Sequence, residues 1–509
     1  NVLKTSYDGY SYLAKLFYDT QNQVYGQVSD YYCGDVCHEG GIVPADLSKP
    51  QMSAKILNEL LVADPRAVWI LQGWWSNPMK EVLDGFGALK QEHILILDLA
   101  ALANPKWTNT KTWEGVEFGS TPWIFCILDN YGGRTGMHGK LKKMAELMDN
   151  ARRKGKVLKG IGITPEGTNG NPVVFDLFWE MAWRTSPPDM DFWLREYAQR
   201  RYGLADQASF VAWKLFEKTV YGVESYDGTT KNNVINENAS LEMGYCTGGY
   251  YKIGYDRELF ERGVKTFMED YEALKHSEGG IYDTVDLLRM TLTIACDDYF
   301  EVLKRARALG DRITFRKYSE KFLSAMKLVS ELSTYNADEL LGNWIGRGLD
   351  FTEDERTGHY AGFDLDMMAY NAKILLTVWA SAPITNYAGR QFDGLMEDYF
   401  LEMWSRLFKR VNKALKDKTE APAKLGKECF TVGWEFTKPG KTYRRNAANP
   451  EGDGADRGLL AVYRDVKKHM GNREELQSLV QKQDVALKKK KLKEEKAALS
   501  STIATNIEH

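Results

Sequence analysis

The chain has 509 residues, enough for about two to four domains with a large core, and its 43% hydrophobic and 27% charged residues are ordinary for a soluble globular protein. Its formal net charge of −3 gives no reason to expect a nucleic acid or an anionic membrane as partner. No apolar run reaches membrane-spanning length, and the six Cys and seven His residues show no metal-site spacing, so we expect no membrane span, metal or cofactor.

Over the first 184 residues, short apolar segments alternate with segments of helical periodicity. The sequence predicts helices at 8–22, with Tyr12, Leu13, Leu16 and Phe17 on its apolar face, and at 52–61, 80–91 and 141–154, and strands at 24–32, 67–71, 94–97, 123–128 and 158–163. This alternation is typical of a parallel sheet with crossover helices. A closed (β/α)8 barrel has eight strands, so five strands within residues 1–184 predict the C-terminal part of such a barrel, with about three strands lying before Asn1.

Two glutamates follow predicted strands. Glu166 lies between Pro165 and Gly167, just beyond the strand at 158–163, and Glu39 lies in the loop after the first strand. A loop glutamate is most often simply solvated. Active-site acids of β/α barrels, however, lie at the carboxyl ends of strands, so both side chains should face the same mouth.

Two carboxyl groups over one cleft suit glycosidic bond cleavage. One protonates the departing oxygen, and the other attacks the anomeric carbon or activates water. An alternative pair is Asp98 with Asp129, since both also follow predicted strands. The simpler interpretation of these two aspartates is that they accept hydrogen bonds from loop backbone.

Further side chains at strand ends are candidates for sugar contacts. Trp74 and Trp75 follow the strand at 67–71, where stacking on a sugar face and simple packing are both plausible. Asn130 opens the turn at 130–133, which either offers an amide to a sugar hydroxyl or is a tight loop whose glycines adopt positive φ. We expect the cysteines to be mostly free and buried.

Beyond Arg184, long segments with helical periodicity replace the strands. They lie at 257–275, 285–308, 313–332, 367–380 and 395–415. We therefore expect an all-α domain at 185–471 after the barrel part at 1–184. Residues 472–509 are rich in Lys and Glu, with four consecutive lysines at 488–491, and should form a charged, solvated, partly helical tail.

Four strings resemble glycoside hydrolase family 89, the α-N-acetylglucosaminidases. They are AVWILQGWWS at 67–76, ILILDLAA at 94–101, WIFCILDNYGGRTGMHGK at 123–140 and GIGITPEGTNGNPVVFDLFWEMAWRT at 160–185. The resemblance continues more weakly through LLTVWASAPITNYAGRQFDGLM at 375–396 and fades after about residue 471. It implies a barrel and a following all-α domain that build one active site together.

The resemblance also implies roles for single residues. Glu166, in TPEG, would be the nucleophile, and Glu39, in HEGG, the acid/base. His38 stands where related barrel enzymes commonly have Asn, and a neutral imidazole can still hydrogen-bond the sugar 2-substituent.

Sugar contacts are implied from both domains. Trp74 would contribute from the barrel part, and Trp379, Ile384 and Tyr387 would contribute across the domain boundary.

The implied activity is a retaining exo-glycosidase that removes terminal α-linked N-acetylglucosamine, with the two carboxyl groups about 5 to 6 Å apart. The partner would be a glycan, and family membership favours a lysosomal or secreted location. Two alternatives stay open: a non-catalytic glycan-binding or truncated remnant, and a related glycosidase acting on a different amino sugar. The oligomeric state, including a homo-oligomer, is also open.

Overall fold

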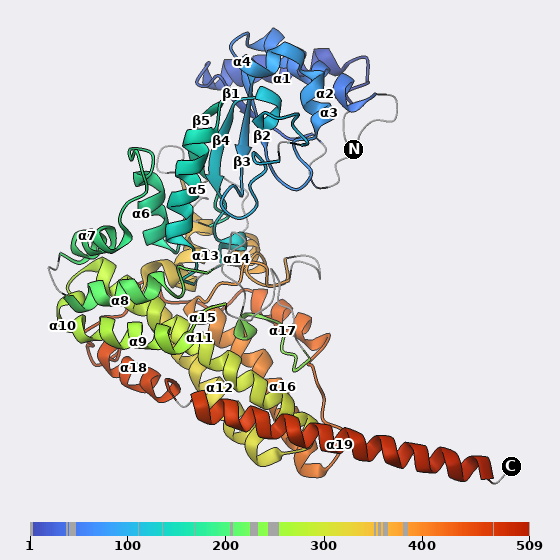
Figure 1. The fold of residues 1–509 in the computed structure, drawn as a ribbon, viewed down its shortest axis with the longest axis vertical. Coiled ribbons are helices and arrows are strands. Elements are labelled where there is room, and N and C mark those ends of the chain that lie inside the picture. The colour runs from blue at the N-terminus through green and yellow to red at the C-terminus, as the bar shows by residue number, and fades with distance from the viewer. Residues whose placement is uncertain are drawn as a thin grey trace.

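The computed structural model describes residues 4–36, 39, 47–109, 111–134, 136–167, 169–203, 207–223, 233–242, 254–350, 353–354, 358–359, 365–379, 385–471 and 473–507. Two units are visible in Figure 1. The sheet unit comprises the elements from α1 to α6, and the helical unit comprises those from α7 to α19. Within the described ranges, no helix has both the length and the apolar character needed to cross a bilayer.

The sheet unit contains a parallel sheet in which each strand pairs with the next one along the chain. Its strands are β1 (Tyr31–Cys33), β2 (Val68–Gln72), β3 (Ile94–Asp98), β4 (Trp123–Ile127) and β5 (Leu158–Ile163), and its longer helices are α1 (Tyr10–Tyr25), α2 (Lys49–Ala63), α5 (Leu141–Lys154) and α6 (Pro172–Glu180). α-Helices lie between β1 and β2, between β2 and β3, and between β4 and β5, which is the βα arrangement of a barrel wall, so the predicted parallel sheet is confirmed.

The beginning of the chain differs from the prediction. The strand predicted at 24–32 is wrong over residues 24–30, because α1 continues to Tyr25, Gly26 follows with a φ of 74°, and β1 begins only at Tyr31. The alternating side chains of this stretch favoured a strand, but the helix extends until Gly26, where glycine permits the positive φ that ends it. The apolar face predicted for this helix is largely uncovered, with Phe17 64% exposed.

Two other predictions need correction in detail. A short apolar segment such as 158–163 predicts a buried strand, yet β5 is at the edge of the sheet and five of its six residues are only half-buried. The single helix expected at 80–91 is divided into α3 (Lys80–Gly85), a 3-10 turn and α4 (Lys90–His93). Gly87, with φ 54°, lies at this break.

The helical unit is built around two long helices, α11 (Glu278–Leu309) and α12 (Arg312–Ser333), which match the predictions at 285–308 and 313–332. The other helices are α7 (Met190–Tyr202), α8 (Gln207–Glu217), α9 (Arg257–Phe267), α10 (Tyr271–Leu274), α13 (Leu341–Asp350), α14 (Leu365–Ile374), α15 (Asp393–Leu395), α16 (Leu401–Asp417), α17 (Glu428–Thr437) and α18 (Leu459–Val466). Trp404 is fully buried in its core, with its ring 4.9 Å from that of Phe322 and 5.3 Å from that of Phe408.

The Lys-rich segment belongs to a continuous helix, α19 (Arg473–Ile507), which runs along the helical unit and extends beyond it (Figure 1). Its first half packs on α11: Asp484 pairs with Arg305 at 2.7 Å, and the Gln483 amide donates to the Val302 carbonyl. Residues 488–497 are exposed. The four lysines therefore form the solvated surface that their charge predicts.

Candidate active site

Glu166 lies just beyond the carboxyl end of β5. The sheet pairing extends one residue further, because the Thr164 N–H donates to the Ile127 carbonyl at 3.0 Å. The exposed Glu166 carboxylate then accepts two hydrogen bonds on Oε2, from the Gly132 N–H at 2.7 Å and from the Tyr387 hydroxyl at 2.8 Å. The loops after β4 and β5 and the helical unit therefore meet at this one carboxylate.

The loop after β4 reaches Glu166 through a left-handed turn. Asn130, Gly132 and Gly133 have φ values of 61°, 65° and 77°, and the Gly133 N–H donates to the Asn130 carbonyl at 2.6 Å. A Cβ on Gly132 would collide with the Tyr387 carbonyl. The predicted positive-φ turn is confirmed, and its glycine also permits the close approach of the two units.

The side chain of Asn130 holds the neighbouring loop. It is fully buried, its amide nitrogen donates to the Asn169 carbonyl at 3.1 Å, and its amide oxygen faces the Asn171 amide at 3.4 Å. Asn171 also donates to the Asp129 carboxylate at 3.1 Å. These contacts fix the loop that follows Glu166, whereas a sugar contact from Asn130 stays a prediction.

Asp98, which was a member of the alternative acid pair, holds a loop as well. It is fully buried at the end of β3, and one of its carboxylate oxygens accepts hydrogen bonds from the N–H groups of Lys106 and Trp107 at 2.9 and 3.0 Å. Burial raises the pKa of Asp98 to about 7. Asp98 thus accepts hydrogen bonds from loop backbone, as its simpler interpretation predicted, whereas the bond to Asp129 described above comes from the Asn171 side chain.

Glu39 and Trp74 form a second polar contact after β1 and β2. The Trp74 indole N–H donates to Glu39 Oε1 at 2.9 Å. Trp74 is half-buried, whereas Trp75 is 69% exposed. Because the strands are parallel, this pair lies at the same edge of the sheet as Glu166. His38 lies outside the described residues.

Aromatic side chains of the helical unit approach Glu166 from the other side. The Tyr387 and Trp379 rings meet edge to face with centroids 5.8 Å apart, and the Arg134 guanidinium lies 5.2 Å from the centre of the Tyr387 ring. Two of the helical-unit residues implied by the resemblance are therefore brought together, while Ile384 lies outside the described residues.

Comparison with known families matches both units. Residues 1–185 match the alpha-N-acetylglucosaminidase tim-barrel domain, and residues 193–457 match the alpha-N-acetylglucosaminidase C-terminal domain. The chain belongs to the α-N-acetylglucosaminidase family. The sheet unit is thus part of a TIM barrel and the helical unit is the family's C-terminal domain.

Individual members of the α-N-acetylglucosaminidase family agree with this assignment. Human alpha-N-acetylglucosaminidase is 27% identical over 367 residues, which are 69% of this chain and 46% of that protein. The family 89 glycoside hydrolase of Clostridium perfringens, solved with 2-acetamido-1,2-dideoxynojirmycin, is 29% identical with a TM-score of 0.82 over 92% of this chain and 52% of that one. A variant of the Clostridium perfringens protein with two glutamate-to-glutamine substitutions was solved with its substrate GlcNAc-alpha-1,4-galactose. It is 28% identical to this chain, with a TM-score of 0.83 over 94% of this chain and 53% of that one. This chain therefore spans about half the length of these relatives.

Two arginines of this α-N-acetylglucosaminidase family member lie near the Glu166 loops and were not predicted from the sequence. Arg134 is buried against Tyr387, and Arg390 is buried against Gly133 and Gly167. Arg134 directly follows the glycine turn, which was a usable signal, but nothing near Arg390 in the sequence indicated a contact with residues more than 200 positions away. No cluster of three or more His, Cys, Asp or Glu suited to a metal ion occurs in the described ranges.

Proposed function

We propose that this chain carries both catalytic glutamates of a retaining exo-glycosidase that hydrolyses terminal α-linked N-acetylglucosamine from glycans. The observation that carries the proposal is the Glu166 carboxylate at the end of β5, held by the Gly132 N–H and the Tyr387 hydroxyl. Both donors bind Oε2, and no described residue donates to Oε1. The two hydrogen bonds to Oε2 orient the carboxylate, and its other oxygen, Oε1, is then suited to attack a substrate carbon.

The stereochemistry of the substrate favours an enzyme nucleophile. In an α-N-acetylglucosaminide the acetamido group lies on the same face as the leaving group, so its carbonyl cannot attack the anomeric carbon from the opposite face. Glu166 would therefore attack, the C1–O bond to the leaving group would break, and a covalent glycosyl-enzyme would form. Water would then release the sugar with retention of configuration.

Glu39 is the proposed acid/base. It would protonate the departing glycosidic oxygen in the first step and remove a proton from water in the second. The hydrogen bond from Trp74 fixes one carboxyl oxygen of Glu39, so that the other oxygen can carry the proton. A retaining enzyme requires the two carboxyl groups to lie about 5 to 6 Å apart when the substrate is bound.

The remaining predicted contacts would bind the sugar. We propose stacking by Trp74 and Trp379 and polar contact by Tyr387, and we retain the sugar contacts predicted for His38, Asn130 and Ile384. A glycan substrate is supported by the Clostridium perfringens relative, whose complex holds GlcNAc-alpha-1,4-galactose. The proposed division is a barrel part at 1–184, a helical domain at 185–471 and a tail at 472–509. A lysosomal or secreted location is proposed on family resemblance.

The proposal is tested by hydrolysis of a chromogenic aryl α-N-acetylglucosaminide. Glu166→Gln keeps the size of the side chain but removes the nucleophile, and we expect kcat to fall at least about a thousandfold. Glu146→Gln, which changes an exposed glutamate on α5, is the matched control and should leave kcat unchanged. Full activity of Glu166→Gln, or the β-anomer as the first product seen by NMR, would refute the assignment.

A non-catalytic, glycan-binding remnant is the second candidate, because the uncovered face of α1 and the half-exposed edge strand β5 leave the sheet unit incompletely packed. Calorimetry with 2-acetamido-1,2-dideoxynojirmycin separates the two candidates. Binding without hydrolysis supports the binding role. Hydrolysis of other aryl amino sugars in preference to the N-acetylglucosaminide would instead support the related glycosidase.

A further inference from the structure

Arg390 is a buried cation at the junction of the two units. Only 4% of the residue is exposed, and its guanidinium lies 5.5 Å from the ring centre of Phe392 and 5.9 Å from that of Trp344. Burial lowers the pKa of Arg390. No carboxylate of the described ranges forms an ion pair with it, and its buried Nη1 has no hydrogen-bond partner there. Stability alone rarely explains such a group, because a buried charge without a partner is destabilising.

The guanidinium contacts the two loops that hold Glu166. A Cβ built on Gly133, in the loop after β4, would collide with Arg390 Nη2. A Cβ on Gly167, directly after Glu166, would lie 2.7 Å from the same nitrogen and 2.5 Å from the Gly133 Cα. Arg390 therefore packs against both glycines where the two loops touch, one residue away from Gly132 and from Glu166.

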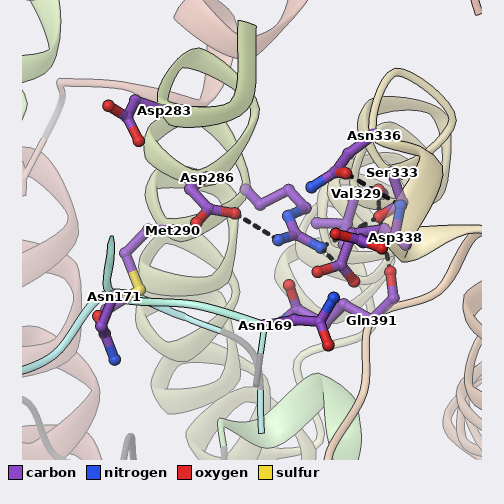
Figure 2. A network of polar contacts seen from close by, with 12 residues as sticks. Asn169, Asn171, Asp283, Asp286, Met290, Val329, Ser333, Asn336, Asp338 and Gln391 are labelled. Atoms are coloured by element: carbon purple, nitrogen blue, oxygen red, sulfur yellow. Dashed lines mark hydrogen bonds and ion pairs between the residues drawn. The ribbon is translucent and has the colours of Figure 1, made fainter. Parts of the chain in front are cut away.

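The backbone of Arg390 is firmly anchored in the helical unit. Its carbonyl accepts from the Asn236 amide at 3.1 Å, and the carbonyl of the next residue, Gln391, accepts from the Ser333 hydroxyl at 2.6 Å. Figure 2 shows Ser333 and Gln391 within a polar network, and the buried ion pairs of that network are made by Arg289, 2.5 Å from Asp286 and 3.0 Å from Glu339. Arg289 makes the ion pairs with both carboxylates, so the Arg390 guanidinium is not held by them and packs against the loops.

We infer that Arg390 is a positioning residue for the catalytic carboxylate. Its guanidinium sets the separation between Gly133 and Gly167, and thereby keeps the Gly132 N–H directed at Glu166. This inference rests on the proposed function in that it takes Glu166 to be catalytic, but the positioning of the loops by Arg390 does not depend on activity. The competing explanation is that Arg390 only fills the aromatic core formed by Phe392 and Trp344.

The test compares Arg390→Met, which keeps the length of the side chain without its charge, with Arg390→Lys, which keeps both length and charge. Arg305→Met is the matched control, since Arg305 is a paired arginine of α11 that contacts Asp484 on α19. Amide hydrogen exchange is followed by mass spectrometry in peptides covering 128–134 and 158–167, and in α12 as the internal reference.

We expect Arg390→Met to raise exchange in both loop peptides at least about fivefold while α12 stays unchanged, and Arg390→Lys to stay within about twofold of the unsubstituted chain. On the chromogenic substrate, Arg390→Met should lower kcat about tenfold or more with KM within about threefold, because a misplaced catalytic group loses rate rather than affinity. Arg305→Met should change neither the loop exchange nor kcat.

Each outcome decides the inference. Unchanged loop exchange in Arg390→Met, or an equal rise in α12, would overturn it, since the second result means that Arg390 only stabilises the core. If Arg390→Met does not fold, Gly167→Ala must raise loop exchange from the opposite side of the contact, and no change in Gly167→Ala would also overturn it. Absence of hydrolysis by the unsubstituted chain would count against the proposed function, and the exchange result would still decide the role of Arg390.

Discussion

Removal of the Tyr387 hydroxyl should weaken catalysis without weakening the fold. In Tyr387→Phe the ring remains, so its edge-to-face contact with Trp379 at 5.8 Å and its contact with Arg134 at 5.2 Å are retained. The 2.8 Å hydrogen bond from the hydroxyl to Glu166 Oε2 is lost. A hydrogen bond to a charged group contributes about 1.5 to 3 kcal/mol, and the exposure of Glu166 favours the lower end. About 1.5 kcal/mol corresponds to roughly a tenfold change in rate.

We therefore expect kcat/KM of Tyr387→Phe on the chromogenic N-acetylglucosaminide to fall about tenfold, with a thermal unfolding midpoint within about 1 °C of the unsubstituted chain. The Gly132 N–H still holds the same carboxylate oxygen, which is why the loss should not approach that of Glu166→Gln. A change in kcat/KM of less than about twofold would show that the hydroxyl does not orient the carboxylate. An equal loss accompanied by a large fall in the midpoint would show that the ring contacts, not the hydroxyl, matter.

Two predictions concern stability. Burial raises the pKa of Asp98 from 3.8 to about 7. The unfolded chain therefore loses the Asp98 proton at a lower pH than the folded chain does. As a result, Asp98 destabilises the fold increasingly as pH rises from about 4 to about 7. Urea unfolding should show Asp98→Asn gaining stability relative to the unsubstituted chain over this range, by at most roughly 4 kcal/mol, and a constant difference would refute the reasoning. Arg289→Met leaves the buried carboxylates of Asp286 and Glu339 without their cation and should cost about 3 to 5 kcal/mol in the same assay, whereas Arg316→Met, in an exposed pair with Glu320, should cost less than about 1 kcal/mol. Equal losses of stability for the two arginine variants would contradict the reasoning that a buried ion pair is costlier to break than an exposed one.

The sequence predicted elements well where local pattern and tertiary environment agree. The helix at 141–154 and the strand at 158–163 have the predicted bounds, because a strongly amphipathic segment and a short apolar run each have one obvious conformation. Prediction failed at 24–30, where alternating side chains indicated a strand but the preceding helix continued to the first available glycine.

The site was predictable only in part, since its contacts join distant parts of the chain. Glu166 could be singled out because a strand end and a glycine-rich loop lie next to it in the sequence. Its hydrogen bond to Tyr387 spans 221 positions, and no local pattern reports such a contact. Arg390 is still harder to predict from the sequence, because it packs against two glycines that look like ordinary turn residues until the units are brought together.

The two hydrogen bonds to Glu166 come from different units of the chain, one from the loop after β4 beside the sheet and one from the helical unit. Buried apolar side chains of both units form one continuous cluster, so the position of each donor depends on how the units pack together. A substitution at the contact between the units can therefore displace one donor and lower the proposed activity, even though Glu166 itself is unchanged.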